Sequence, residues 1–493
     1  MINFVCINFS GCCHRYKDKH SNSMVKETER HQDKELLKRI ARLVKQNKDL
    51  QEQIRQLAES NDKLAELVDK YERRLARLKA GEGEGEDPDD QSGILKFKMG
   101  TVLFADIQGF GRLTEEMDTQ SMMDELDDLF FHFDSIVKKY KLQKIKTIGD
   151  SYMCAGGVPA KNSTNPIDVV MAALEMTLYL DELKNRSDKN KVWDIRTGVH
   201  TGSVTAIATG KKKVSWELKG DTVNIASRLS SSCDVGKINI SANTYELVKE
   251  FFACEYNGKI PVKYLGDLEM YYVRGIIPEM SVNGKGLEPD HRFDTKFKLI
   301  QFVDLQEIIL DKLEKELPAY LYYHNVKHTI DVVTEVELIG WAEGVSEEEV
   351  LILKTAALFH DAGHTVGYDR HEELGCELAR QYLPGYNFSD EQIDRVCELI
   401  MATQMPPRPR NLLEKIMCDS DLDYLGRSDF IPVSNTLYKE LREQEKIGTL
   451  NDWNKLQIKF ISGHQYFTET ARNLREVNKQ KQIERIKSLI EED

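Results

Sequence analysis

Two aspartates in the middle of this 493-residue chain stand where apolar segments end. Residues 101–105 have the composition of a buried strand and are followed by Asp106, and residues 144–148 are followed by Gly149 and Asp150. A single aspartate in such a place is ordinarily a turn or a helix cap. Two strand ends that are neighbours in a sheet would instead bring two carboxylates together. That arrangement suits a pair of Mg²⁺ ions that activate a hydroxyl and neutralise phosphate charge.

A second concentration of reactive side chains lies in the C-terminal part of the chain. In the segment YYHNVKH we expect His324 and His328 to share one helical face, because they are four residues apart. The segment HDAGH adds an adjacent His–Asp pair and a further histidine, and three aspartates follow in CDSDLDYLG. A lone histidine on a helix is more often a packed or surface group. A dense set of imidazoles and carboxylates at fixed spacing indicates a metal centre with nitrogen and oxygen ligands.

Length and composition limit what these residues can belong to. At 493 residues we expect about three domains, and 41% apolar with 30% charged residues is typical of a soluble globular protein. The formal net charge of −14 argues against a general nucleic-acid binder, whereas nucleotide substrates need only a few local cations or metals. No apolar run approaches the roughly 18 residues of a membrane span, and the N-terminus lacks the features of a secretory signal.

The nine cysteines are odd in number and scattered, which favours reduced thiols and a cytoplasmic protein. Cys6, Cys12, Cys13 and His14 cluster near the N-terminus, but the second half of a zinc site does not follow. Residues 1–30 are therefore predicted to be a disordered tail with free thiols.

Residues 36–78 carry a seven-residue repeat, and residues 31–80 are predicted to form a parallel coiled-coil dimerisation helix. Asparagine at two core positions is the feature that fixes register and the dimeric state. The alternative is a long amphipathic helix packed on its own chain. A DNA-binding zipper is not expected, because the charges of residues 21–35 cancel. The repeating positions are Leu36, Leu43, Leu50, Leu57, Leu64, Tyr71 and Leu78, with Ile40, Asn47, Ile54, Asn61, Val68 and Leu75.

Breaks in composition divide the remainder. Residues 81–93 alternate glycine with acidic residues and are predicted to be a linker, and residues 279–291 contain a second break rich in glycine and proline. Between them, residues 94–278 mix strand-like runs at 101–105, 144–148 and 195–199 with helical runs at 121–140 and 167–183. Residues 292–493 are predicted to be mostly helical. The expected protein is thus multidomain: a coiled coil, an α+β domain and an all-α domain.

Four motifs of the middle domain carry a family resemblance. FADIQGF, KIKTIGDSYM, GVHTG and GDTVNIASRL occur in order, and residues 97–275 resemble the class III adenylate/guanylate cyclases. The resemblance implies a ferredoxin-like βαββαβ core, joined head to tail with a second copy so that active sites lie between them. It also implies two Mg²⁺ or Mn²⁺ ions per site, held by Asp106, Asp150 and the carbonyl of Ile107. Transition-state residues fall on Asn224 and Arg228, and a phosphate-binding lysine falls on Lys263.

The base-reading positions of that family fall on Lys146 and Glu217. A lysine only donates hydrogen bonds and a carboxylate only accepts them, so this pair is suited to the N1 acceptor and N6 donor of adenine. The expected reaction is conversion of ATP to 3′,5′-cyclic AMP and pyrophosphate, with guanylate cyclase less expected. In a homodimer, the aspartates would come from one subunit and the other groups from its partner. The alternative interpretation is that Lys146 and Glu217 are solvated charges at the edges of strands.

The C-terminal motifs resemble the HD metal-dependent phosphohydrolases, over about residues 292–430. YHNxxxH and HDxxH are closest to the class I cyclic-nucleotide phosphodiesterases. The resemblance implies one or two divalent metals (Zn, Mn, Mg or Fe), His324 as general acid, and His364 beside the phosphate. The purine-clamping glutamine of the phosphodiesterases cannot be placed, and residues 371–373 resemble other HD enzymes, so the substrate is open. The implied metal ligands are His328, His360, Asp361 and Asp421, with Asp419 as the alternative to Asp421.

Three hypotheses follow from these resemblances. The first is an adenylate cyclase. The second makes the HD domain a working phosphodiesterase, so that the chain is bifunctional or even chiefly a hydrolase. The third treats the HD domain as a non-catalytic sensor of nucleotide or metal that regulates the cyclase.

Overall fold

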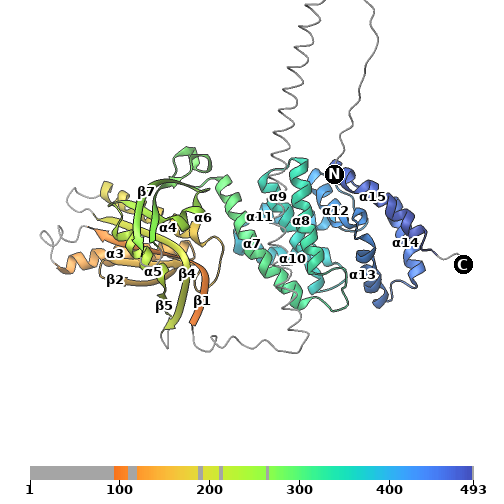
Figure 1. Cartoon of the computed structure of the whole chain (residues 1–493), viewed down its shortest axis with the longest axis horizontal. Coiled ribbons are helices and arrows are strands. Elements are labelled where there is room, and N and C mark those ends of the chain that lie inside the picture. Colours follow the sequence, from red (N-terminus) through yellow and green to blue (C-terminus); the bar gives the residue numbers. More distant parts are fainter. Residues whose placement is uncertain (1–93, 109–118, 187–192, 210–214, 263–265, 491–493) are drawn as a thin grey trace, which may run out of the picture. The chain divides into compact units, whose positions relative to one another are not determined.

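The computed structural model describes residues 94–108, 119–186, 193–209, 215–262 and 266–490 (Figure 1). The N-terminal tail, the heptad repeat at 36–78 and Lys263 lie outside these ranges, so the coiled coil and the role of Lys263 stay predictions. No helix in the described ranges combines the length and the apolar character that a membrane crossing requires. The six cysteines described carry free thiols.

The predicted α+β domain is built on one mixed sheet. Its strand order is β2-β3-β1-β4-β6-β8-β7, and β5 pairs with β4. The first four strands and the helices α3 and α4 follow the order βαββαβ, with β2-β3-β1-β4 paired antiparallel. The predicted strands and helices of this domain are confirmed. The elements are β1 Ile94–Gln108, α3 Thr119–Lys139, β2 Gln143–Ile148, β3 Ser151–Gly156, α4 Asn165–Arg186, β4 Asp194–Thr209, β5 Ser215–Lys219, α5 Asp221–Ser231, β6 Lys237–Ser241, α6 Ala242–Val248, β7 Phe252–Val262 and β8 Gly266–Ile276.

Strand β1 sends alternate side chains to two different cores. Leu103 and Ile107 join the core beneath α3 and α4, whereas Val102 and Phe104 join a smaller core on the opposite face. Because side chains alternate along a strand, Asp106 lies on the same face as Phe104, where α5 packs. The sequence pattern of β1 therefore decides which face of the sheet carries the aspartate.

Helix α5 can approach the sheet closely only because β4 has a glycine at the crossing point. A Cβ atom on Gly198 would lie 2.1 Å from the Ser230 nitrogen and 2.3 Å from the Ala226 oxygen. Real Cβ atoms do not come so near to backbone atoms, so a side chain here would push α5 away from β1 and β4. The first glycine of GVHTG thus keeps α5 within reach of Asp106.

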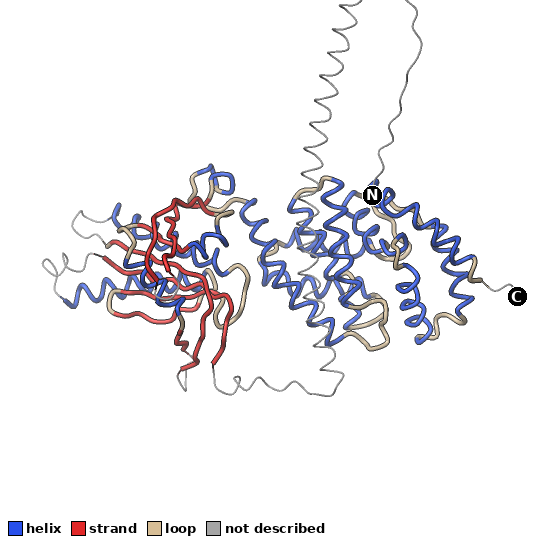
Figure 2. The backbone as a smooth tube through the Cα atoms, in the orientation of Figure 1, coloured by secondary structure: helices blue, strands red, loops and turns tan. Residues whose placement is uncertain are grey.

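The C-terminal part is helical, as predicted (Figure 2). Its helices are α7 His291–Glu316, α8 Val326–Glu343, α9 Glu347–Phe359, α10 His371–Tyr382, α11 Asp390–Ala402, α12 Leu412–Asp421, α13 Phe430–Glu443, α14 Leu450–Gly463 and α15 Glu469–Lys487. Helix α9 is buried from Val350 to Phe359, except at Lys354, and its apolar side chains belong to the main helical core. The packing around α9 therefore fixes the end of this helix, and His360 and Asp361, which follow it, are buried.

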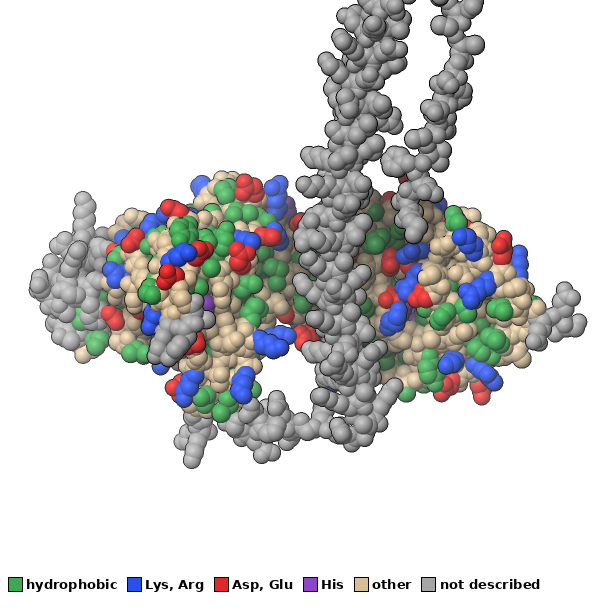
Figure 3. All heavy atoms as spheres, viewed as in Figure 1, with side chains coloured by type: hydrophobic (Ala, Val, Ile, Leu, Met, Phe, Trp, Pro, Cys, Tyr) green, Lys and Arg blue, Asp and Glu red, His purple; other side chains and the backbone are tan. Residues whose placement is uncertain are grey.

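Helix α7 contributes to both cores. Phe293 in its first turn packs edge-on against Phe251 of the sheet domain, and Phe302 and Leu305 belong to the helical core. The segment before α7, predicted as a linker, forms two short 3₁₀ turns, η2 Pro278–Met280 and η3 Val282–Gly284. On the face drawn in Figure 3, acidic and basic side chains are interspersed.

Candidate active sites

The two predicted carboxylate positions of the sheet domain are neighbours. The backbone nitrogen of Ile107 donates to the backbone oxygen of Asp150 at 2.9 Å, which ties β1 to the turn between β2 and β3. The sequence suggested that Asp106 stands at the end of a strand. In the structure β4 pairs with β1 as far as Gln108, so Asp106 lies inside β1. The backbone segments that carry the two aspartates are nevertheless adjacent, and the metal-binding role of the two carboxylates stays a prediction.

Different interactions hold the two aspartates. The carboxylate of Asp106 accepts hydrogen bonds from the hydroxyls of Ser151 and Ser230, the latter at 2.7 Å. Asp150 follows Gly149, whose φ of +61° favours glycine, and its side chain is exposed. Two carboxylates and the nearby Ile107 backbone form a set of hard oxygen groups, which is the ligand type that Mg²⁺ and Mn²⁺ prefer. The residues present therefore fit the predicted metal pair.

The other predicted cyclase residues lie on exposed surfaces. Asn224 and Arg228 are four residues apart on α5, so they share one face of the helix, as their spacing predicted. Both side chains are exposed. The Arg228 guanidinium donates to the Pro261 oxygen at 3.0 Å. Lys146 on β2 and Glu217 on β5 are also exposed, and neither has a hydrogen-bond or ion-pair partner within the described ranges. All four side chains are thus accessible to a bound molecule or another subunit.

The helical domain gathers the predicted metal ligands around one point. His328 Nε2 lies 3.3 Å from His360 Nε2 and 3.1 Å from Asp421 Oδ1. Asp361 Oδ2 lies 3.4 Å from His328 Nε2 and 3.2 Å from His360 Nε2. Two imidazoles and two carboxylates therefore turn their ligand atoms toward one another, although they come from α8, from the end of α9 and from α12.

Several features show that this cluster suits a divalent cation. His360 Nδ1 donates to the Ala357 oxygen at 2.8 Å, which leaves Nε2 as the ring nitrogen that faces the cluster. Asp361 Oδ2 is buried and has no hydrogen-bond partner among the described residues. Burial alone would lower the pKa of His360, but Asp361 and Asp421 outweigh it and raise that pKa well above its usual value. The carboxylates of the cluster thus stabilise positive charge, and a bound metal ion would supply that charge in place of a proton.

A second group of histidines surrounds the other oxygen of Asp361. His324 and His364 have ligand atoms close to Asp361, and His371 Nε2 lies 3.7 Å from Asp361 Oδ1. Burial lowers the pKa of His364 to about 3, so this imidazole is neutral and available as a ligand. Both His364 nitrogens are buried without hydrogen-bond partners among the described residues. With Asp361 between the two groups, the donor set suits two metals, and His371 is a candidate ligand that the sequence reading noted only as part of a motif.

The structure corrects the predicted position of His324. Helix α8 begins at Val326, because the Asn325 side chain caps it by accepting from the backbone nitrogens of Lys327 and His328. His324 therefore precedes the helix and does not share a helical face with His328. Its orientation comes instead from a distant carboxylate, that of Glu440 on α13.

Glu440 is a functional candidate that the sequence reading missed. Its fully buried carboxylate accepts from the backbone nitrogens of Tyr323 and His324, at 2.9 and 3.2 Å. It also accepts from His324 Nδ1 at 2.5 Å. Burial alone would lower the pKa of His324, but Asp361 and Glu440 outweigh it and raise the pKa. A raised pKa favours the protonated form of His324, which is the form that a general acid requires.

The partners of the two candidate aspartates of α12 favour Asp421 as the metal ligand. Asp419 accepts from the backbone nitrogens of Phe467 and Thr468 and from the Thr468 hydroxyl, so it anchors the start of α15. Its side chain is fully occupied away from the histidines. Asp421, two residues later, contacts His328 and His360, which supports it as the ligand.

Two family models match the chain: the adenylate and guanylate cyclase catalytic domain over residues 95–275 and the HD domain over residues 325–423. An adenylate cyclase of Mycobacterium tuberculosis is 34% identical over 180 residues, covering 36% of this chain and 40% of that protein. Guanylate cyclase 32E of Drosophila melanogaster is 35% identical over 176 residues, covering 35% of this chain and 15% of that protein. The chain thus matches about two-fifths of the mycobacterial protein and much less of the fly protein.

Solved structures match the same part of the chain. The guanylate cyclase domain from Catenaria anguillulae in complex with GTP is 32% identical, with a TM-score of 0.34, and the match covers 36% of this chain and 97% of that one. An adenylyl cyclase from P. aeruginosa is 28% identical, with a TM-score of 0.34, covering 36% and 95%. The curated relatives of this part of the chain include both an adenylate cyclase and a guanylate cyclase.

Proposed function

We propose that this chain makes cyclic AMP and also hydrolyses a phosphoester, since residues 95–275 are a class III nucleotidyl cyclase catalytic domain and residues 325–423 an HD domain. The observation that carries the cyclase is the bond between Ile107 and Asp150, which brings the two aspartates together. The observation that carries the hydrolase is the ring of imidazole and carboxylate ligand atoms around Asp361.

In the cyclase domain, Asp106, Asp150 and the Ile107 carbonyl would hold two Mg²⁺ or Mn²⁺ ions. Bound metals would activate the ribose 3′-hydroxyl and neutralise triphosphate charge. Ser151 and Ser230 orient the Asp106 carboxylate toward that task. The proposed reaction joins the 3′-oxygen to the α-phosphorus and releases pyrophosphate, with Asn224 and Arg228 stabilising the developing charge.

ATP is the proposed substrate because of the chemistry of Lys146 and Glu217. Lysine donates to adenine N1 and glutamate accepts from N6, whereas guanine would oppose a donor with N1–H and an acceptor with O6. The unpartnered state of both side chains within the described ranges leaves them available to a base. Relatives of both specificities exist, so this pair supplies the argument for adenine.

We expect the double substitution Lys146→Glu with Glu217→Cys to shift preference from ATP toward GTP. The acid at position 146 would accept from guanine N1–H and N2, and the smaller residue at 217 would no longer oppose O6. An unpaired buried polar group costs about 1–3 kcal/mol, which corresponds to roughly ten- to hundredfold discrimination. The measurement is the ratio of kcat/KM for ATP and GTP in the wild type, in each single mutant and in the double mutant.

The single Lys146→Glu change should remove most ATP use without creating full GTP use, because Glu217 would still repel O6. A wild type that prefers GTP would show that this pair does not read adenine. A double mutant with the wild-type ratio would lead to the same conclusion.

We further propose that the cyclase site is shared between two copies of the chain, as dimerisation is a property of cyclase domains. Mixing an inactive Asp150→Ala chain with an inactive Arg228→Ala chain should then restore activity, because one of the two shared sites in the heterodimer keeps both halves. The test measures cyclic AMP formation by heterodimers isolated through two different affinity tags. Inactive heterodimers would place the whole site within one subunit.

In the HD domain, His328, His360, Asp361 and Asp421 would hold one divalent metal, and Asp361, His364 and His371 a second. Bound metals would supply an activated water and neutralise phosphate charge. His324 would donate its proton to the leaving oxygen, and Glu440 keeps the imidazole oriented and protonated. A cyclic 3′,5′-phosphodiester is the proposed substrate, which makes the HD domain a phosphodiesterase acting on the product of the cyclase.

We expect Glu440→Gln to lower hydrolysis of cyclic AMP by about tenfold or more and to move the alkaline limb of the pH profile to lower pH. His324 acts in its protonated form, so activity is present below its pKa and is lost as the pH rises through it. Glu440 raises that pKa, and its loss therefore brings the fall in activity to a lower pH. The measurement is kcat against pH for the wild type and the variant.

Glu443→Gln is the matched control, because Glu443 lies on the same helix and, among the described residues, accepts a hydrogen bond only from the surface hydroxyl of Tyr322. A phosphodiester with a nitrophenolate leaving group needs little protonation, so its hydrolysis should fall much less in Glu440→Gln. An equal loss on both substrates, with an unshifted pH profile, would reduce Glu440 to a structural role.

A further inference from the structure

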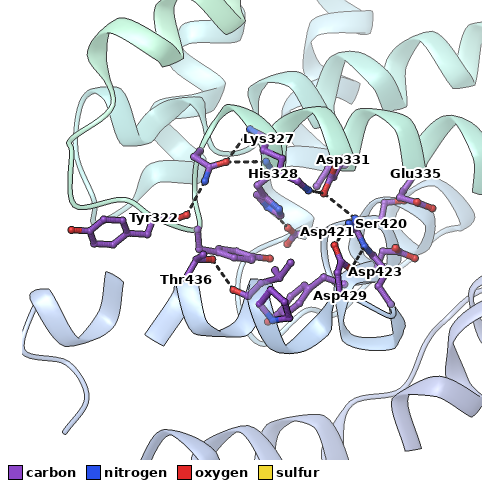
Figure 4. A pocket seen from close by; sticks show the side chains of 17 residues that line it. Tyr322, Lys327, His328, Asp331, Glu335, Ser420, Asp421, Asp423, Asp429 and Thr436 are labelled. Carbon is purple, nitrogen blue, oxygen red and sulfur yellow. Dashed lines mark hydrogen bonds and ion pairs between the residues drawn. The ribbon is translucent and has the colours of Figure 1, made fainter. Parts of the chain in front are cut away.

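A cavity away from the metal cluster of the helical domain is lined by a cysteine. The cavity drawn in Figure 4 is lined by His328 and Asp421 and belongs to that cluster. A different cavity, of about 550 Å³, shares no lining residue with it and is lined by Cys397 of α11 and Arg380 of α10. Cys397 is only 7% exposed, so this cavity is the route by which a small molecule can approach it.

The side chains of Cys376 on α10 and Cys397 on α11 face each other. Cys376 Sγ lies 3.6 Å from the backbone oxygen of Cys397, and Cys397 Sγ lies 3.8 Å from the backbone oxygen of Cys376. A disulfide joins two residues only when their backbones are close and their side chains converge, and these reciprocal contacts indicate both. The two thiols are free in the structure. Two cysteines that can be joined are thus adjacent, although 21 residues separate them in sequence.

The two thiols of this pair differ in how readily they ionise. The hydrogen bond with the Cys376 thiol lowers the pKa of Cys397, and the Arg380 guanidinium adds to that effect, whereas burial and Asp394 oppose it. The pKa of Cys376 is raised, first by the same hydrogen bond and then by burial. Because the thiolate is the nucleophilic form of cysteine, Cys397 is the better nucleophile and Cys376 retains its proton.

The other described cysteines have a different environment. Burial raises the pKa of Cys154, Cys233, Cys254 and Cys418. A buried thiol of that kind packs as a small apolar group and reacts slowly. Among the described cysteines, Cys397 is the one whose pKa is lowered, and it is also the one that lines the second cavity.

We propose that Cys376 and Cys397 form a redox-active dithiol, which a low-molecular-weight disulfide such as oxidised glutathione converts into an intramolecular disulfide. The Cys397 thiolate first attacks one sulfur of the small disulfide, which forms a mixed disulfide and releases one small thiolate. The Cys376 sulfur then attacks Cys397 Sγ, and the second small thiolate leaves with the proton that Cys376 gives up. Two protein thiols are oxidised and one small disulfide is reduced to two thiols, so no other oxidant is needed.

The test exposes the reduced full chain, freed of reductant, to oxidised glutathione and maps the cysteine peptides by mass spectrometry. We expect a disulfide that links the peptides of Cys376 and Cys397. In Cys376→Ser the second step is blocked, so glutathione should remain attached to Cys397. In Cys397→Ser the nucleophile is absent, and glutathione should attach to Cys376 at least about tenfold more slowly than it attaches to Cys397 in Cys376→Ser.

Cys254→Ser is the matched control, because Cys254 is a partly buried thiol of β7 whose pKa is raised by burial. This variant should form the linked peptide at the wild-type rate. If circular dichroism shows that Cys376→Ser or Cys397→Ser is unfolded, alkylation of the reduced wild type by iodoacetamide carries the test without a substitution. Cys397 should then react at least about tenfold faster than Cys254.

Failure of the wild type to form the linked peptide would overturn the inference. Glutathione attached to Cys376 while Cys397 stays reduced would reverse the two roles and overturn it as well, and so would equal alkylation of Cys397 and Cys254. None of these measurements depends on cyclase or hydrolase activity, so their outcome is distinct from that of the proposed functions.

Discussion

Cyclase activity should fall by at least about a thousandfold when Asp150 is replaced by alanine. The substitution removes a hard oxygen ligand, and the triphosphate charge and the 3′-hydroxyl then lose the metal that acts on them. The measurement is the rate of cyclic AMP formation from ATP at saturating Mn²⁺, in the wild type and the variant. Asp106→Ala should have an effect of the same size.

The fold should be retained in Asp150→Ala. The Asp150 side chain is exposed, and the hydrogen bond that ties its turn to Ile107 uses the backbone oxygen, which alanine keeps. Asp181→Ala is a matched control, because Asp181 is an exposed carboxylate of the same domain, and Lys184 is its only partner within the described ranges. Cyclase activity within tenfold of the wild type in either Asp106→Ala or Asp150→Ala would contradict the metal assignment.

The second large effect is expected from Asp361→Ala, which should abolish phosphodiester hydrolysis while cyclase activity continues. Asp361 faces both histidine groups, with Oδ2 near His328 and His360 and Oδ1 near His371. Its loss removes the one carboxylate that both candidate metals share. The measurements are AMP release from cyclic AMP and the metal content of the dialysed protein.

Continued cyclase activity provides the folding control in this variant. Asp394→Ala offers a second control, because Asp394 is a surface carboxylate of α11 paired with Arg380. Unchanged hydrolysis and unchanged metal content in Asp361→Ala would show that the cluster is a structural ion network.

Much of the cyclase site could be predicted from sequence because its positions follow from local patterns. The apolar runs before Asp106 and Asp150 predict strands, and the four-residue spacing of Asn224 and Arg228 on α5 places them on one face. In each of these motifs, the residues that form the strand or helix are adjacent in sequence to the functional residue that it positions. What the sequence could not show is the backbone bond from Ile107 to Asp150, which depends on how the strands pair.

The helical domain shows where prediction from sequence reached its limit. Glu440 acts on His324 from 116 residues away and belongs to no motif, so only tertiary packing reveals it. The choice of Asp421 over Asp419 likewise depends on distant partners, because Asp419 bonds Phe467 and Thr468 at the start of α15. A short sequence motif does not show which residues from distant parts of the chain contact it.

The most direct test of the account is a time course of labelled ATP with the wild type, Asp150→Ala and Asp361→Ala, following cyclic AMP and AMP together. We predict that the wild type forms cyclic AMP and then AMP, and that Asp361→Ala accumulates cyclic AMP without forming AMP. Asp150→Ala should form neither product from ATP but should still convert added cyclic AMP to AMP. Absence of cyclic AMP in every reaction, or AMP formed from ATP by Asp150→Ala, would contradict a cyclase coupled to a phosphodiesterase.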